Sequence, residues 1–340
     1  MVNSPMPSAI QFTSPAFDFD LLGRSHGWAW LAPFEWDESS QTLSRPLHMP
    51  DGGHVMARIC CTAAGESRLR VRANFAAPVD SPARTLLGAQ VRRVLSLDQD
   101  LSEFHAACAG DPFLDFVARA GAGRILRGPT VFEDVIKTVC TVNCDWRNTT
   151  RMSAALCDLG GGNFPVPKML LRYTEPKLAR VVPLGYRART VLDIARRSDA
   201  GKLPLDEWAA AGDWQRVAAV LDEIWGIGPY AAAHIRMLLG DFSTIPVDGE
   251  VLKYLRGVHF NGRPISPKKA VEPYAHHGRF QFLAFKFGRI ARKLHYVRNT
   301  IEGEIVARPI PPMAAQTPAR YATKKIRRKG KSTRPSARGW

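Results

Sequence analysis

The chain has 340 residues, 45% of them apolar, so it can bury a sizeable core spread over about two domains. Its formal net charge of +16 favours a polyanionic partner. The charge alone does not distinguish nucleic acid from an anionic membrane surface, or either of them from a role in solubility. No apolar run reaches the roughly 20 residues of a membrane span and the N-terminus lacks a secretory signal pattern, so we expect a cytoplasmic protein without a membrane partner, nucleoid-associated if bacterial.

The N-terminal quarter of the chain is predicted to be rich in β-strands. Polar and apolar residues alternate strictly over 68–75, as they do in a strand with one buried face, and less regularly over 54–61. Glycine-containing turns lie between such runs. We therefore expect residues 1–14 to be disordered and residues 15–98 to form an antiparallel β-rich domain.

Helical spacing takes over from about Leu101, and we expect residues 99–300 to form an all-α domain, which makes the fold class α+β. Thr130 and Glu133 have the spacing of a capping box ahead of valines that recur every three or four residues. Further helices are predicted at 148–158, 188–198, 213–224, 229–239, 249–257 and 278–294. Residues 308–340 are predicted to be a disordered basic tail, since nine basic residues and no acid follow position 319.

The segment 213–240 predicts two helices joined by a tight turn, a helix-hairpin-helix. Asp213 can cap the first helix, two glycines break it, and Pro229 suits the first position of the second helix. The outward backbone N–H groups of such a turn can hold a DNA phosphate without side-chain charge. Here they belong to Gly226, Ile227, Gly228 and Tyr230. An ordinary joint between two helices would have the same glycines.

Downstream of the hairpin, Pro-Val-Asp at 246–248 opens another predicted helix. A Leu-x-x-Ile-x-Gly-Ile-Gly hairpin at 221–228 followed by Pro-Val-Asp resembles the helix-hairpin-helix DNA glycosylase superfamily. In that family the aspartate is essential for breaking the glycosidic bond, so the resemblance implies that Asp248 is the catalytic carboxylate. An aspartate before an apolar helix is also a common N-cap, and the two roles are compatible.

A second likeness points to the 8-oxoguanine DNA glycosylase branch of the superfamily. Gly-Tyr-Arg-Ala-Arg at 185–189 is identical to a segment of that branch, and residues 130–157 resemble its helix and loop that probe the opposite strand. The resemblance implies contacts with the unpaired base after flipping, from Asn143, Tyr186 and Arg187. A solvated basic helix face for Arg187 and a helix C-cap for Asn143 are the competing interpretations.

The chain departs from that branch at several positions. Bifunctional members carry a lysine where this chain has Tyr230, and a neutral phenol cannot form a Schiff base with the sugar. Alkylpurine glycosylases of the 3-methyladenine DNA glycosylase II type also place an aromatic residue there, so the likeness assigns Tyr230 to the base pocket, with His234 one helical turn further. Both residues could instead be packing side chains. Residues 24–28 replace a Gly-Gln-Ser-Phe-like segment that helps to recognise 8-oxoguanine.

Cofactors are not expected. The six cysteines form no disulfide framework, and Cys140 and Cys144 lack a second Cys or His pair, so no metal site is predicted. No cysteine follows Cys157, so the C-terminal iron–sulfur loop of endonuclease III-like relatives is absent. A monovalent cation at the hairpin is compatible with the sequence.

The sequence thus predicts a monomeric base-excision repair glycosylase that flips an alkylated or oxidised base out of double-stranded DNA and hydrolyses its glycosidic bond. Two alternatives remain open at this point. One is a noncatalytic helix-hairpin-helix DNA-binding protein. The other is a bifunctional glycosylase/lyase that uses a different amine, such as Lys137 or Lys253.

Overall fold

The computed structural model describes residues 8–64, 68–111 and 113–293 of the chain. The predicted basic tail, 308–340, lies outside the described residues. Within the described part, no helix combines the length and the apolar character that a membrane span requires.

An antiparallel five-stranded sheet forms the N-terminal part, with strand order β1-β5-β4-β3-β2. Its strands are β1 (Ala9–Pro15), β2 (Glu35–Asp37), β3 (Thr42–His48), β4 (His54–Ala63) and β5 (Arg68–Phe75). The alternation that predicted β5 is confirmed, since Val71, Ala73 and Phe75 are buried. One expectation was wrong: residues 9–14 are not disordered, because they pair with β5 from Ala9 opposite Asn74 onward.

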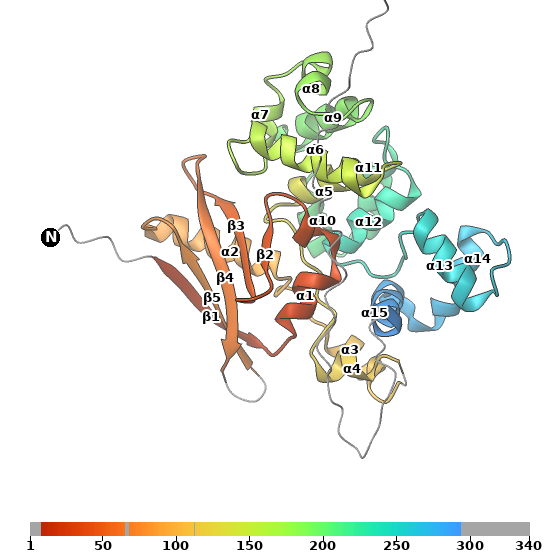
Figure 1. The fold of residues 1–340 in the computed structure, drawn as a ribbon. Coiled ribbons are helices and arrows are strands. Elements are labelled where there is room, and N and C mark those ends of the chain that lie inside the picture. Colours follow the sequence, from red (N-terminus) through yellow and green to blue (C-terminus); the bar gives the residue numbers. More distant parts are fainter. Residues whose placement is uncertain (1–7, 65–67, 112, 294–340) are drawn as a thin grey trace, which may run out of the picture.

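From residue 102 onward the described chain is mostly helical, as the period of the apolar residues predicts. Residues 19–30 and 81–94, within the segment that was expected to be β-rich, are largely helical as well. In chain order the helices are α1 (Phe19–Ser25), the 3-10 helix η1 (Gly27–Trp30), α2 (Ser81–Val94), α3 (Ser102–Cys108), α4 (Asp115–Arg119), α5 (Val131–Thr141), α6 (Trp146–Leu159), α7 (Pro167–Leu170), α8 (Glu175–Val181), α9 (Arg187–Asp199), α10 (Leu205–Ala210), α11 (Trp214–Asp222), α12 (Pro229–Leu239), α13 (Gly249–His259), α14 (Pro267–Val271), the 3-10 helix η2 (Glu272–Phe280) and α15 (Gln281–Lys293). Figure 1 shows the sheet on one side of the molecule and helices α5–α12 above and beside it. The α+β fold class is confirmed.

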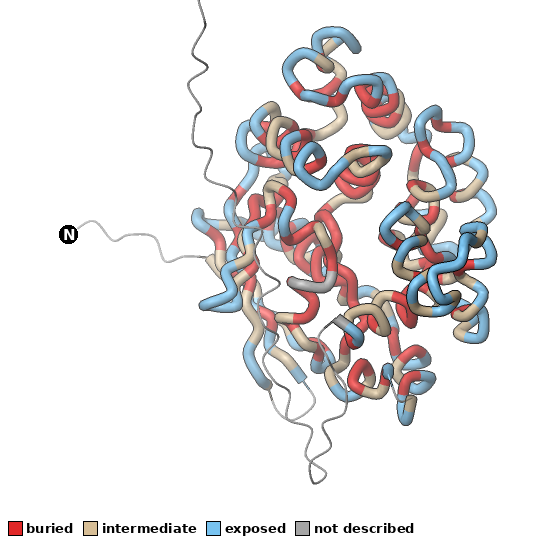
Figure 2. The backbone as a smooth tube through the Cα atoms, turned by 45° about the vertical axis from the view of Figure 1, so that its right-hand side comes forward, coloured by how far each residue is buried: buried red, intermediate tan, exposed pale blue. Residues whose placement is uncertain are grey.

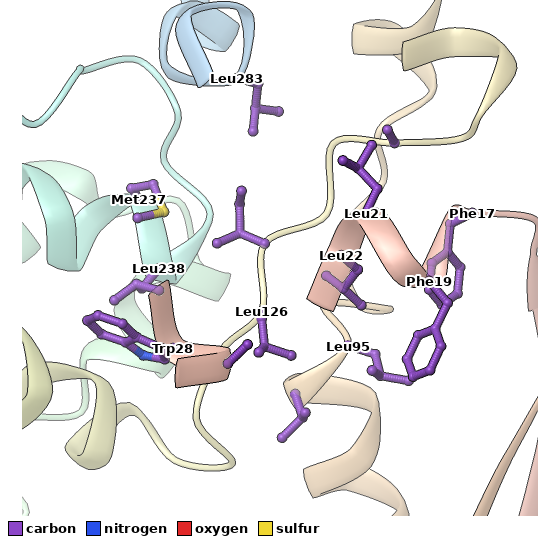
Figure 3. Close-up of a cluster of buried hydrophobic side chains, with 14 of the residues drawn as sticks. Phe17, Phe19, Leu21, Leu22, Trp28, Leu95, Leu126, Met237, Leu238 and Leu283 are labelled. Atoms are coloured by element: carbon purple, nitrogen blue, oxygen red, sulfur yellow. The ribbon is translucent and has the colours of Figure 1, made fainter. Parts of the chain in front are cut away.

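The buried hydrophobic side chains of the described residues form two clusters. Figure 2 marks the buried residues in red along the backbone. The first cluster joins the sheet and α1–α4 to the C-terminal helices from Met237 onward, and the second joins α5–α12 as far as Ile235. Helix α12 therefore belongs to both cores. Figure 3 shows the first cluster where it meets this helix, with Trp28 beside Leu238 and with Leu126 nearby.

A buried ionic group fastens the sheet to α5. Arg45 of β3 forms a two-pronged pair with Glu133, with N–O distances of 3.1 and 3.0 Å, and Lys137 Nζ lies 2.7 Å from the same carboxylate. The predicted capping box is therefore half correct. Thr130 does accept the Glu133 N–H at 3.2 Å, but the Glu133 side chain turns to the two cations instead of back to the helix start.

Candidate active site

The hairpin has the geometry that its glycines predict. Helix α11 begins after Asp213, whose carboxylate accepts the Arg216 N–H at 3.0 Å, and α12 begins with Pro229. Gly226 has a φ of +87°, and a Cβ there would lie 2.6 Å from Thr190 Oγ1, so the turn requires glycine on two counts. A Cβ on Gly228 would meet no heavy atom within 4 Å, so the space in front of the α12 N-terminus is open.

Asp248 is the N-cap of α13. Its Oδ1 accepts the Val251 N–H at 2.7 Å, while its Oδ2 has no hydrogen-bond partner among the described residues. Val251 and Leu255 of α13 belong to the first hydrophobic cluster. Burial of this helix face therefore fixes the position of the exposed carboxylate at the helix start.

The hairpin and Asp248 line one cleft of about 710 Å³. Three segments form its wall, namely residues 141–144 after α5, residues 226–231 of the hairpin and residues 247–250 at the start of α13. The hairpin belongs to the second hydrophobic cluster and α13 to the first, so the cleft lies where the two cores meet. Two helix N-termini, those of α12 and α13, contribute to it, and each carries unpaired backbone N–H groups.

Tyr230 lies in this cleft at the start of α12. Its hydroxyl is 3.5 Å from Thr141 Oγ1. Burial raises the pKa of the Tyr230 phenol and the nearby Asp248 carboxylate raises it further, although the Thr141 contact opposes the change. The phenol is therefore uncharged at neutral pH, and it lies close enough to Asp248 for the carboxylate to shift its pKa.

His234 follows Tyr230 by one helical turn but does not line the cleft. Its ring stacks on Trp28 of η1, with centroids 5.3 Å apart and planes at 25°, and also contacts Tyr230, with centroids 5.7 Å apart. Burial, followed by the charge of Lys286, lowers the pKa of His234 to about 3, and its Nε2 is buried without a hydrogen-bond partner among the described residues. His234 is thus a neutral ring behind the cleft wall.

The predicted strand-probing residues lie on one side of the cleft but differ in exposure. Asn143 is exposed and has a φ of +46°, a left-handed conformation that asparagine tolerates better than most residues. Arg187 is buried, and its guanidinium donates to the backbone carbonyls of Val142 and Asn143 from behind the loop. Tyr186 is exposed. The solvated basic helix face considered for Arg187 is therefore not what the structure shows.

Sequence comparison finds no matching family model and no matching curated protein. Comparison of this structure with solved structures finds DNA glycosylases of similar fold. The 3-methyladenine DNA glycosylase from Archaeoglobus fulgidus has a TM-score of 0.65 at 18% identity, covering 85% of this chain and 99% of that chain. The 8-oxoguanine glycosylase/lyase from Clostridium acetobutylicum, in complex with double-stranded DNA containing cytosine opposite 8-oxoguanine, has a TM-score of 0.61 at 18% identity, covering 85% and 98%. MBOgg1, in complex with a low-affinity DNA ligand, has a TM-score of 0.60 at 16% identity, covering 84% and 99%.

This chain has the helix-hairpin-helix DNA glycosylase fold. The resemblance inferred from the hairpin and Pro-Val-Asp is thereby confirmed at the level of the fold. The match extends over the sheet as well as the helices, since about 85% of the chain is covered.

Neither of the two alternative amines lines the cleft. Lys137 is fully buried and paired with Glu133 in the ionic group beneath the sheet. Lys253 is exposed on α13 and does not line the cleft.

Among the cleft residues that the sequence analysis missed are Thr141 and Glu250. It also missed Trp225, which lies directly before Gly226 and is half exposed. Glu250 could have been found from its position in the first turn of the helix that Asp248 caps. Trp225 had a signal too, because a large apolar residue has no core to fill in the outward part of a hairpin.

The described residues contain no group of three or more His, Cys, Asp or Glu side chains that could hold a metal ion. Cys140 is buried, and burial raises the pKa of its thiol to about 12. It therefore behaves as an apolar core residue.

Proposed function

We propose that the protein is a DNA glycosylase that removes a damaged base by hydrolysis, with Asp248 as its catalytic carboxylate. The observation that carries the proposal is that Asp248 and the glycine hairpin line the same cleft, although Asp248 lies 20 positions after Gly228 in the chain. A fold shared with solved DNA glycosylases supports the same assignment.

The two helix N-termini suit a nucleic acid substrate. We expect the backbone N–H groups of Gly228 and Tyr230, at the start of α12, to bind a phosphate. The Ile227 N–H, predicted to do the same, instead donates to the Ile224 carbonyl at 3.1 Å, so Ile227 shapes the turn. A phosphate held at the start of α12 brings the neighbouring sugar toward the start of α13. The scissile bond lies inside the duplex, so the target nucleotide has to be extruded, which costs least at damaged or mismatched pairs.

Asp248 then acts on the sugar. Departure of the base leaves positive charge on the sugar ring, and an ionised carboxylate beside that centre stabilises it and can orient the attacking water. The hydrogen bond from Val251 N–H to Oδ1 holds the carboxylate in place, and Oδ2 remains available to the cleft. Asn143 lines the cleft, and Arg187 donates to its carbonyl, so Asn143 is the residue that we expect to fill the vacated position.

The charge of the cleft favours an alkylated base over an oxidised one. Its described lining includes the carboxylates of Asp248 and Glu250 and no lysine or arginine. Many N-alkylated purines carry a positive charge, and the aromatic face of Tyr230 suits such a cation as well. His234 supports the Tyr230 ring from behind.

Base release from a panel of duplexes carrying alkylated or oxidised bases tests the proposal. We expect the wild type to release at least one alkylated base and Asp248→Asn to release none at a comparable rate. If both proteins bind the duplexes and neither releases any base, the noncatalytic DNA-binding alternative is correct.

Hydrolysis by water also excludes a covalent intermediate with the protein. We expect no adduct when the wild type is mixed with abasic DNA and borohydride, because Tyr230 occupies the cleft position where a lysine would form an imine. Tyr230→Lys provides the comparison, since it places an amine at that position. Trapping of the wild type would instead support the bifunctional alternative.

A further inference from the structure

Two exposed aromatic rings stand side by side at the rim of the cleft. Tyr186, at the start of α9, is 49% exposed, and Trp225, in the connection between α11 and α12, is 50% exposed. Their centroids are 6.0 Å apart and their planes are at 88°, an edge-to-face pair. We refer to these two rings as the aromatic pair. Exposed apolar surface of this size, paired rather than scattered, is typical of a binding surface.

The aromatic pair is held in place from both sides. The Trp225 carbonyl accepts a hydrogen bond of 2.9 Å from Thr190 Oγ1 of α9, so the residue before Gly226 is fastened to the helix that starts at Tyr186. The close approach of Gly226 to the same Thr190 hydroxyl fixes the direction in which the chain leaves Trp225. The rings are therefore preorganised, and little conformational entropy would be lost on binding.

Two guanidinium groups lie over the aromatic pair. Arg187 Cζ is 4.7 Å from the Tyr186 ring centroid, and Arg189 Cζ is 5.1 Å from the Trp225 ring centroid. A flat apolar face combined with arginine charge suits a nucleobase and its phosphate better than it suits an apolar peptide.

The aromatic pair is also continuous with the cleft. Arg187, which follows Tyr186, holds the Asn143 carbonyl of the cleft wall, and Gly226, which follows Trp225, lines the cleft itself. A ligand that leaves the cleft on this side would meet the two rings next.

We propose that Trp225, held against Tyr186, is a stacking surface for a DNA base next to the position vacated by the flipped nucleotide. The inference rests on the proposed function, because it assumes that a duplex lies across the cleft. Trp225 would bind a base that has lost its stacking neighbour and would contribute little on an intact duplex, where each base face is already covered.

Binding of two otherwise identical duplexes tests this, one intact and one with a stable tetrahydrofuran abasic-site analogue. Trp225→Ala should weaken binding of the abasic duplex about tenfold and leave binding of the intact duplex within about threefold, while Trp225→Phe should stay close to the wild type. Trp208→Ala is the control for removing a tryptophan away from the cleft, and its thermal midpoint is measured too because Trp208 packs against the second hydrophobic cluster. Trp208 also lies beneath an arginine, with Arg216 Cζ 4.3 Å from its ring centroid, but it does not line the cleft.

Equal loss on both duplexes, or no loss on either, would overturn the inference. An unchanged thermal midpoint of Trp225→Ala shows that any loss is not due to unfolding. The base-release assay separates the two proposals. Failure of the wild type to release any base contradicts the proposed function, whereas base release combined with wild-type binding of abasic DNA by Trp225→Ala contradicts only the role of Trp225.

Discussion

His234 stacks on Trp28, and this contact joins the second helix of the hairpin to the 3-10 turn that follows α1. The two residues are 206 positions apart in the sequence. Trp28 is fixed in turn, because its Nε1 donates to Asp134 Oδ1 at 2.7 Å. The contact therefore connects α12, behind the cleft, to η1 and, through Asp134, to α5. Its contribution to stability should depend on pH, because His234 titrates.

Acid should weaken the fold through His234. Burial lowers the pKa of His234 to about 3 in the folded protein, so between about pH 6.5 and 3 the unfolded chain binds a proton that the folded chain does not. The free energy of unfolding should therefore fall as the pH is lowered through this window. His234→Phe keeps a ring against Trp28 and removes the titrating group.

Urea unfolding at pH 7 and pH 5 measures the effect. Between these values the wild type should lose about 2 kcal/mol more than His234→Phe. The pKa of His26 is lowered by burial and next by the charge of His234, so the difference between the two proteins reports His234 together with its effect on His26. The same pH dependence in the two proteins would show that His234 does not titrate as described.

The buried ionic group should be costly to break. Glu133→Gln leaves Arg45 and Lys137 buried without their counter-charge, so we expect it to reduce the free energy of unfolding by about 3–5 kcal/mol. Asp193→Asn is the control, since it breaks the pair of Asp193 with Arg197 near the surface and should cost less than about 1 kcal/mol. Chemical denaturation of both variants at pH 7 gives the comparison, and equal losses would contradict it.

Acid should also lower the free energy of unfolding by protonating Glu133. Burial pushes the pKa of Glu133 upward, but Arg45 and Lys137 outweigh it and lower the pKa to about 2. The stabilisation by Glu133 should thus be complete above its ordinary pKa of 4.5 and disappear as the pH falls toward 2.

The two hairpin glycines should respond differently to the same substitution. Gly226→Ala puts a Cβ against Thr190 Oγ1 at a φ of +87°, so it should destabilise the protein by roughly 1–3 kcal/mol. Gly228→Ala meets open space at an ordinary φ of −96°, so its cost in stability should be under about 1 kcal/mol. Its methyl group would stand where we place the phosphate and should weaken DNA binding.

Fluorescence anisotropy with a labelled duplex, together with urea unfolding, separates these effects. A Gly228→Ala protein that binds DNA as tightly as the wild type would show that no phosphate approaches the start of α12 from this side.

The parts of the site that the sequence predicts are those set by local rules. The turn at Gly226, the first helical position of Pro229 and the cap at Asp248 each depend on a few neighbouring residues, and all three are found in the structure. Strands β4 and β5 followed from the alternation of polar and apolar residues, and the longer helices from α5 onward followed from the spacing of apolar residues. These patterns depend only on residues that are close in sequence, so they can be recognised without knowing the tertiary contacts.

The parts that the sequence does not predict depend on distant partners. Glu133 fits a capping box locally, but Arg45, 88 residues away, draws its side chain elsewhere. Arg187 looks like a solvated residue of a basic helix until the Asn143 loop covers it. Strand β1 was missed because its partner β5 lies some 60 residues further along the chain. Pairings of this kind are decided by tertiary packing, which overrides local pattern.

The most direct test of the account is the rate of base release by Asp248→Asn on the best alkylated substrate, measured under single-turnover conditions with protein in excess. Asparagine also caps helices, so the variant should unfold within about 0.5 kcal/mol of the wild type. Loss of the negative charge should slow base release by about a hundredfold or more. A folded Asp248→Asn protein that releases the base within about threefold of the wild-type rate would contradict the central claim.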